Sequence, residues 1–599
     1  MTTSNSHSIQ HRQTLESDET NEQILFGNLA DHFFSEFEDT IADEHYRQAY
    51  PLGENNLSPS HGLSRTDMQE TGQLSEISLP RTLLDTNDDL NPQTLGYSAD
   101  MDPYLLQQYR YDSSSCFQFK QLSIRTVSHG CFPTQFLLSQ PGMFSPSREE
   151  MGLKHASHVA IREGLESLVS SDTGHRLISL FRRFVLPQYP IFSECMFPDP
   201  KSSPPYLLAT IYMISQPFAR FDDVLSIELA YENLDYQALF GLVHDALQFE
   251  AHNPDIAVVQ AMLLLIARPS TSPLILESSF KWSLHGTLVS TAQNLGLHLD
   301  PSHWNIASWQ ISLRRRISAT IFSLDKWLAA SLGRPPLLRR DDWLVTCLTT
   351  EDHYSSSVSS DQWIHYICYT TLSSILGDTL HKLFSLRAIQ NLASDVEKTL
   401  SSSRPLLEDL SRWHQEFIEL SAETRTTGSS LPMVCSLGYH YVQMTIFRAI
   451  MRPFLEKRSS NGAKADITSQ FQGDQADITG FARTGVHSAT TAASDFVKGL
   501  QEKHSQLFWP HWTQVAFSCI CFLDLLMAVS SPNMQEALTW FQELRNVRRE
   551  MRLKSIMLPV LRLGLLRIDA IFWKGIDTVL HLPPHVDEAL KASLDSAEA

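Results

Sequence analysis

From about residue 175 to residue 582, apolar residues recur every three or four positions, a spacing that places them on one face of an α-helix. Residues 281–297 and residues 312–332 show the pattern most clearly. Helical runs of this kind alternate with Pro, Ser and Gly, and few runs alternate in the way that strands do. The sequence therefore predicts a mainly α fold, a multi-helical body preceded by a largely disordered N-terminal segment.

The N-terminal residues 1–150 differ from that body in composition. Ser, Thr, Asn, Gln, Asp and Pro dominate, and few apolar residues recur at helical spacing. Such a segment cannot bury enough apolar surface to offset its chain entropy, so we expect residues 1–150 to be mostly disordered. Within them, Phe117–Val127 alternates in places like a strand, which predicts a small unit between Phe117 and Phe144.

The segment 21–50 interleaves apolar and acidic side chains. Seven acidic residues oppose a single basic one, Arg47, and the aromatic residues include Phe33, Phe34 and Phe37. This composition is typical of disordered activation segments, in which charge keeps aromatic side chains exposed for a partner's groove. The alternative, which the sequence leaves open, is a short amphipathic helix that docks on the protein's own surface.

The C-terminal third contains one interruption of the helical pattern. Residues 456–483 are mostly polar and are expected to form a flexible insertion, after which residues 484–582 continue the helical body and residues 583–599 form a tail. The most apolar run, Val515–Val529, contains Asp524 and is shorter than the roughly 20 residues that span a bilayer. It is predicted to be a buried helix, and no membrane partner is expected.

Motifs for catalysis or metal binding are not found. The sequence has no phosphate-binding loop, no nucleophile elbow and no paired-histidine zinc helix. The close cysteine pair, Cys519 and Cys521, lies in an apolar run, and residues two apart on a helix point to nearly opposite sides. We therefore expect core thiols, no cofactor, no metal and no enzymatic activity, and a helical enzyme is the least favoured alternative.

Two basic clusters stand out, Arg314–Arg316 and Arg545–Lys554. Either could contact nucleic acid or a nuclear import receptor, but the sequence favours solvated helix faces with acidic neighbours. The formal net charge of −20 opposes approach to phosphate over the whole surface. DNA is therefore expected to be bound only weakly or indirectly.

Four short motifs follow one another within about sixty residues, and one such motif alone would be weak evidence. They consist of Gly296, Leu297 and His298, then Arg315 and Arg316, then Asp325 and Trp327, then Gly333, Arg334 and Pro335. In this order and at these separations they resemble the middle homology region of fungal zinc-cluster transcription factors. Flanking segments agree, so the resemblance covers roughly residues 175–580, with residues 175–455 as the middle homology domain.

The resemblance implies a nuclear regulator of fungal metabolic or secondary-metabolite genes, with an activator's acidic segment. Its implied partners are the transcription machinery or co-regulators, and a small-molecule effector, while a homodimer or a heterodimer stays open. Members of the family begin with six cysteines that hold two zinc ions, whereas residues 1–115 contain no cysteine. Two alternatives follow: a co-regulator that borrows a zinc-cluster partner's DNA-binding domain, or a truncated gene product that lacks its zinc cluster.

The motif residues also have a physical interpretation. Gly296 and Gly333 are expected to end helices in left-handed caps, and Pro335 prevents the second helix from continuing. Asp325 and Arg334 are expected to pair. On this interpretation the motifs are packing elements, which the sequence favours over a direct ligand site.

Overall fold

The computed structural model describes residues 83–85, 90–119, 122–130, 132–153, 158–230, 233–270, 272, 275–344, 347–353, 356–423, 431–460 and 473–598. Contacts between residues divide the chain into two units, Met1–Ile77 and Ser78–Ala599. The first unit lies outside the described residues, and so does the predicted activation segment 21–50 with Phe33, Phe34 and Phe37.

A four-stranded antiparallel sheet precedes the helical body, with its strands in the order β1-β4-β3-β2. The strands are β1 (Asn91–Thr94), β2 (Cys116–Phe119), β3 (Leu122–Ser128) and β4 (Thr134–Ser139), with the short helix α3 (Pro103–Leu106) between β1 and β2. Strands β2 and β3 cover the alternating stretch, so the strand prediction there is confirmed.

The expectation of disorder is wrong for the described residues between 91 and 150. The sheet buries Val127, Phe136 and Leu138 in a small core that it shares with Trp304 and Ile306 of the helical body. This apolar contact supplies the burial that the N-terminal residues lack by themselves, and it joins segments that are more than 150 residues apart in the sequence.

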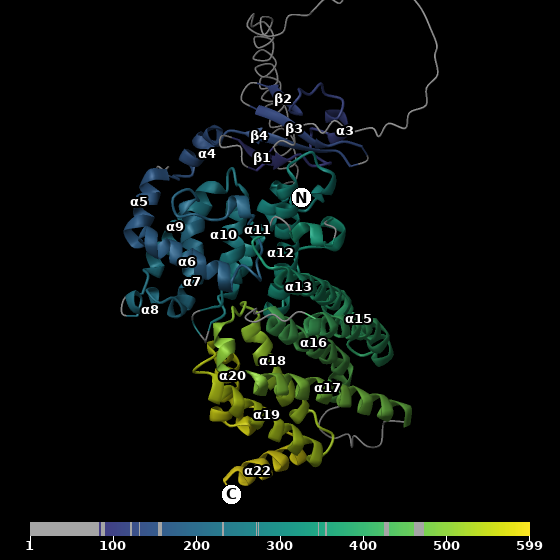
Figure 1. The fold of residues 1–599 in the computed structure, drawn as a ribbon. Coiled ribbons are helices and arrows are strands. Elements are labelled where there is room, and N and C mark those ends of the chain that lie inside the picture. The colour runs from purple at the N-terminus through teal and green to yellow at the C-terminus, as the bar shows by residue number, and fades with distance from the viewer. Residues whose placement is uncertain are drawn as a thin grey trace, which may run out of the picture. The chain divides into compact units, whose positions relative to one another are not determined.

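Helices account for most of the remaining described residues, so the predicted mainly α class is confirmed (Figure 1). The first group of helices is α4 (Ser145–Glu150), α5 (His158–Leu168), α6 (Ser171–Phe184), α7 (Pro205–Ser215), α8 (Leu225–Glu228), α9 (Tyr236–Glu250), α10 (Ile256–Ala267), α11 (Ser278–Asn294) and α12 (Ser308–Leu332). Helices α11 and α12 are the two amphipathic stretches that the sequence predicts, and the observed bounds differ by a few residues.

The second group of helices continues the body toward the C-terminus. It comprises α13 (Ser360–Thr379), α14 (Leu386–Leu392), α15 (Val396–Glu423), α16 (Leu431–Ser460), α17 (Gly473–Gly499), α18 (Thr513–Val529), α19 (Met534–Lys554), α20 (Arg562–Lys574), α21 (Ile576–Val579) and α22 (Pro584–Glu598). Helices that follow one another pack side by side, as α15 with α16 and α18 with α19 do (Figure 1). One continuous apolar core joins both groups, from α5 to α22.

Three expectations for the C-terminal part have clear outcomes. Helix α18 buries most of the apolar run that ends at Val529, as predicted, and no described helix is long and apolar enough to cross a membrane. Residues 583–599 are not a simple tail, because α22 buries Val586, Ala589 and Leu590 and packs on α19. Described parts of the expected insertion 456–483 belong to the end of α16 and the start of α17.

Candidate functional site: a buried polar network on helix α12

The arginine motif lies at the centre of the helical body. Helix α12 buries residues on nearly all sides, and Arg314, Arg315 and Arg316 are 1%, 7% and 0% exposed. The interpretation of this cluster as a solvated helix face is therefore wrong. The amphipathic pattern of α12 did not reveal that the arginines are buried, because the partners of all three guanidinium groups come from segments far away in the sequence.

Arg314 ties the sheet region to the helices. Its Nε donates to the Asp85 carboxylate at 2.9 Å, and its Nη1 donates to the carbonyl of Leu295 at 2.7 Å. The guanidinium also lies over the rings of Phe136 and Trp304, at 5.6 and 5.4 Å from the ring centroids. Arg314 therefore holds the end of α11, the sheet and the segment before it at one point.

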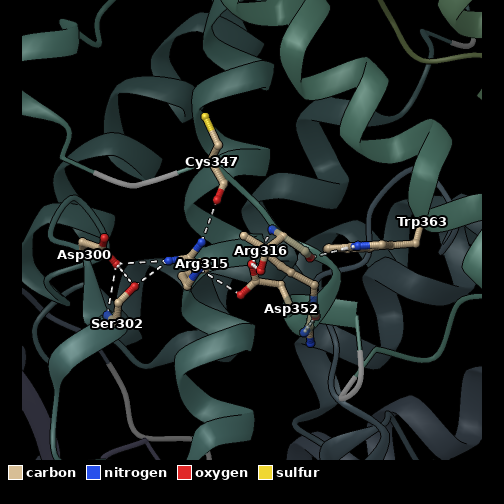
Figure 2. A network of polar contacts seen from close by, with 8 residues as sticks. Asp300, Ser302, Arg315, Arg316, Cys347, Asp352 and Trp363 are labelled. Atoms are coloured by element: carbon tan, nitrogen blue, oxygen red, sulfur yellow. Dashed lines mark hydrogen bonds and ion pairs between the residues drawn. The ribbon is translucent and has the colours of Figure 1, made fainter. Parts of the chain in front are cut away.

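Arg315 binds the loops on either side of α12 (Figure 2). Its Nε lies 2.9 Å from the Asp352 carboxylate, and its Nη1 lies 2.5 Å from Ser302 Oγ and 3.5 Å from the Asp300 carboxylate. Its Nη2 donates to the carbonyl of Cys347 at 2.7 Å. With these four contacts, the Arg315 guanidinium fixes two loops against one helix.

The side chain of Arg316 donates its hydrogen bonds to main-chain carbonyls. Its Nε, Nη1 and Nη2 donate to the carbonyls of Pro190, Asp352 and Phe192, at 2.8, 2.9 and 3.0 Å. Burial lowers the pKa of Arg316 to about 10, which still leaves it charged at neutral pH. Asp352 thus binds both neighbouring arginines, one through its carboxylate and one through its carbonyl.

Asp325, the acidic residue of the third motif, forms a second buried polar group further along α12. The Asp325 carboxylate accepts from His285 Nε2 at 2.8 Å, from Lys326 Nζ at 2.7 Å and from the Leu337 amide at 2.8 Å. Burial alone would raise the pKa of Asp325, but the hydrogen bond from His285 and the nearby ammonium outweigh it and keep that pKa below its usual value. The predicted pair of Asp325 with Arg334 is wrong, because His285 of α11 and Lys326 bind the Asp325 carboxylate instead.

Lys281 and His511 lie beside this group. Lys281 Nζ donates to the carbonyl of Arg268, and burial lowers the pKa of Lys281 to about 7. His511 is 5% exposed, and burial together with the charges of Lys281 and His285 holds its pKa well below the usual value. The network therefore extends from α12 through α11 to the loop before α18.

The two motif glycines have the predicted backbone. Gly296 follows α11 with φ +69°, and Gly333 caps α12 with φ +64°. Arg334 then donates its amide to the carbonyl of Ala329 at 2.9 Å, which closes the helix end, and Pro335 is exposed. The side chain of Arg334 turns away and lies over the ring of Trp282, at 5.3 Å from the ring centroid.

The other motif residues pack. Leu297 is buried, and His298 lies 6.2 Å from Trp343 between ring centroids, where burial lowers the pKa of the imidazole. Trp327 is 0% exposed, stacks on Trp512 at 4.0 Å between ring centroids, and donates from Nε1 to Ser373 Oγ at 2.8 Å. These contacts join α12 to α13 and to the loop before α18.

Two further residue groups were singled out by the sequence. Cys521 is buried in α18 and Cys519 is half-buried, as expected of core thiols. In the cluster Arg545–Lys554, Lys554 pairs with Glu550 of the same helix at 3.4 Å, as the helix-face interpretation expects, whereas Arg548 and Arg552 bind Asp569 of α20, at 2.5 and 2.9 Å. Within the described ranges, no three His, Cys, Asp or Glu side chains lie close enough together to hold a metal ion.

The main partners of the network are residues that sequence reasoning did not select. Asp85, His285 and Asp352 provide its buried acidic and imidazole groups, yet none belongs to a recognisable motif. The available signal was indirect: three adjacent arginines in a helix with apolar residues on several sides require acceptors when they are buried. In the arrangement observed, the charged groups bind one another and main-chain carbonyls, so the site is suited to holding segments together.

Comparison with known proteins assigns the region that carries this network. Residues 177–415 match the fungal specific transcription factor domain. The chain is 27% identical over 315 residues to an uncharacterized transcriptional regulatory protein of Schizosaccharomyces pombe, which covers 51% of the chain and 46% of the relative. It is 23% identical over 509 residues to the transcriptional activator protein DAL81 of Saccharomyces cerevisiae, which covers 76% of the chain and 48% of that relative.

A third relative is the cutinase transcription factor 1 alpha of Fusarium vanettenii, 25% identical over 35% of the chain and 24% of the relative. The chain spans about half the length of the first two relatives, and no solved structure matches it. The matching domain is one of transcription factors and is non-enzymatic, in agreement with the expectation from the sequence. Helix α12 with its three arginines lies inside that domain, and residues 177–415 belong to the fungal specific transcription factor domain family.

Proposed function

We propose that the protein is a nuclear regulator of transcription that activates fungal metabolic genes, secondary-metabolite genes among them. The observation that carries the proposal is the match of residues 177–415 to the transcription factor domain. The name of one relative, the transcriptional activator protein DAL81, supports the positive sign of regulation.

In this proposal the α12 network is the structural centre of the regulatory body. Arg314, Arg315 and Arg316 hold the sheet, two loops and the segment after α6 against one helix. Such buried charges fix geometry more than they add stability, because each arginine loses hydration on burial. The regulatory body therefore offers partners a surface of defined shape, and the motif residues stabilise that shape from inside.

We propose three kinds of partner. The segment 21–50 recruits the transcription machinery or a co-regulator through Phe33, Phe34 and Phe37. DNA is reached through a zinc-cluster partner with which the chain pairs, since the net charge of −20 opposes direct binding. A small-molecule effector acts on the helical body.

The activation segment is tested by fusing residues 21–50 to a heterologous DNA-binding domain in front of a reporter gene. We expect activation, and we expect loss of activation when Phe33, Phe34 and Phe37 are all replaced by Ala, because the aromatic rings make the contact and the acids only solvate them. The fusion with Ser35→Ala serves as the matched control and should stay active. A fusion that is inactive without any substitution would remove the activation segment from the proposal.

The second candidate function is that of a co-regulator that acts only with a DNA-binding partner. The sequence feature that favours it is the lack of cysteine in residues 1–115 of the chain. Gel-shift assays with the purified chain test whether the chain needs a DNA-binding partner to reach DNA. A weak complex that disappears between about 50 and 200 mM salt fits the co-regulator, whereas a nanomolar complex that resists competitor DNA would show direct recognition.

A further inference from the structure

Helix α20 has one buried face and one exposed face. It lies at the edge of the C-terminal part of the body, where it packs on α18 and α19 (Figure 1). The side chains that it buries are those of Leu563, Leu565 and Ile568. The other face carries three exposed apolar residues, Leu566, Ala570 and Trp573. Because they follow one another at helical spacing, they form one apolar stripe along the helix.

The two most exposed large apolar side chains of the described residues belong to this region. Trp573, in the last turn of α20, is 85% exposed, and Ile556, which precedes the helix, is 82% exposed. Arg562 Nε donates to the carbonyl of Ser555 at 3.0 Å, so Ile556 lies next to the first turn of α20. Apolar side chains gathered on an exposed surface in this way are typical of a site that contacts another protein.

Cations flank the apolar stripe. Arg567 and Lys574 are two helical turns apart, so they form a row beside it, and both are exposed. Arg562 lies at the start of the same face, and within the ranges that the structure describes none of these three forms an ion pair with an acidic side chain. The acid of α20, Asp569, binds two arginines of α19 instead. The exposed face is therefore basic, although the chain as a whole carries a net charge of −20.

The charge of this face decides between the kinds of partner that an apolar stripe accepts. A second copy of the same face would place the three cations opposite one another, which opposes a pair of α20 helices. Nucleic acid would contact the cations but would offer the apolar stripe no matching surface, and the net charge of −20 opposes its approach. An amphipathic helix with acidic side chains beside its apolar face matches both the stripe and the cations.

We propose that the exposed face of α20 binds an acidic amphipathic helix of a partner protein. The large apolar side chains of the partner cover Leu566, Ala570 and Trp573, and its carboxylates pair with Arg567 and Lys574. The inference deepens the proposed function, because it names the surface through which a partner protein joins the regulator. Only this regulatory meaning rests on the proposed function, since binding is a property of the purified chain.

The test begins with a selection of peptides on the purified full chain. Random peptides of about 16 residues, roughly four helical turns, are displayed on phage and selected for binding. We expect the enriched peptides to repeat Phe, Trp, Leu or Ile at helical spacing and to carry a net negative charge. The most enriched peptide, made synthetically, should lower the deuterium uptake of residues 562–574, because it covers this helix.

Fluorescence anisotropy with the same peptide separates the two parts of the face. Trp573→Ser should weaken binding about tenfold or more, because a Trp that is covered in a contact commonly dominates it. Arg567→Gln combined with Lys574→Gln should weaken binding about threefold or more, because two ion pairs are lost. The matched control combines Leu386→Ser with Arg387→Gln, two exposed neighbours on α14, and should bind like the wild type. All variants should melt like the wild type, because every substituted side chain is exposed.

Three results would overturn the inference: no selected peptide lowers the deuterium uptake of α20, the enriched peptides carry no net negative charge, or either α20 variant binds like the wild type. The deuterium measurement uses the wild-type chain, so it decides the question even for a variant that does not fold. A chain that binds the acidic peptide through α20 but controls no gene would keep this surface and remove the proposed function. A chain that controls genes while no peptide protects α20 would do the reverse.

Discussion

Replacing Arg316 by Met tests whether the arginine motif holds the regulatory body together. The substitution keeps a long apolar stem and removes the guanidinium, whose three nitrogens donate to the carbonyls of Pro190, Asp352 and Phe192. Because Arg316 is 0% exposed, water cannot replace the lost donors without a rearrangement of the core. The variant therefore leaves three buried acceptors without a partner.

The magnitude follows from two opposing contributions. A buried acceptor without a partner costs about 1–3 kcal/mol, so three of them cost roughly 3–9 kcal/mol. The variant also relieves the desolvation of the guanidinium, which lowers the pKa of Arg316 from 12.5 to about 10 and corresponds to roughly 3 kcal/mol. We expect a net loss of about 3 kcal/mol in the free energy of unfolding.

The assay is equilibrium unfolding in urea, followed by tryptophan fluorescence. The matched control is Arg339→Met, because Arg339 is exposed and its nearest acidic partner, Asp342, lies 4.0 Å away and is exposed too. The control should lie within about 0.5 kcal/mol of the wild type. Equal unfolding midpoints for the two variants would refute the view that Arg316 holds these segments together.

Three further predictions follow from the same region. Gly333→Ala should lower the free energy of unfolding by about 1 kcal/mol, because Gly333 has a positive φ. Gly296→Ala should cost about 1–3 kcal/mol more, since an added Cβ would lie 2.5 Å from Thr94 Oγ1. Thermal melts that show equal losses for the two variants would contradict this. Lys281 has a pKa of about 7 in the folded chain against 10.5 in the unfolded chain, so the unfolded chain binds more protons between these two pH values. The free energy of unfolding of the wild type should therefore rise by up to roughly 5 kcal/mol from pH 7 to 10.5. Lys281→Met should lack this rise in urea unfolding, and an equal rise in the variant would exclude Lys281 as its source. Asp325→Asn leaves the buried ammonium beside it without its counter-ion and should cost about 3–5 kcal/mol; wild-type melting combined with lost regulation would instead indicate a ligand site.

Local patterns in the sequence predicted the elements that depend on local physics. The spacing of apolar residues predicted the bounds of α11 and α12 to within a few residues, because apolar residues on the buried face of a helix recur every three or four positions. The glycines at 296 and 333 predicted left-handed helix ends, because few other residues adopt a positive φ without strain. The resemblance to the transcription factor family rested on the same stretch, and the family comparison confirmed it.

Features that depend on distant partners were not predictable in this way. Arg314 looked like a surface residue, because its partner Asp85 lies 229 residues earlier in the sequence. Apart from the strand-like run Phe117–Val127, residues 1–150 looked too polar to fold, because the apolar residues of the sheet pack on Trp304 and Ile306 of the distant helical body.

The central claim is that the chain regulates transcription in the nucleus. The most direct measurement is genome-wide chromatin occupancy of the tagged protein, combined with transcript profiles of cells with and without its gene. We predict enrichment at promoters of metabolic genes whose transcripts fall when the gene is deleted, and loss of that enrichment when the zinc-cluster partner is deleted. Occupancy no higher than that of an untagged strain, with unchanged transcripts after deletion, would contradict the claim.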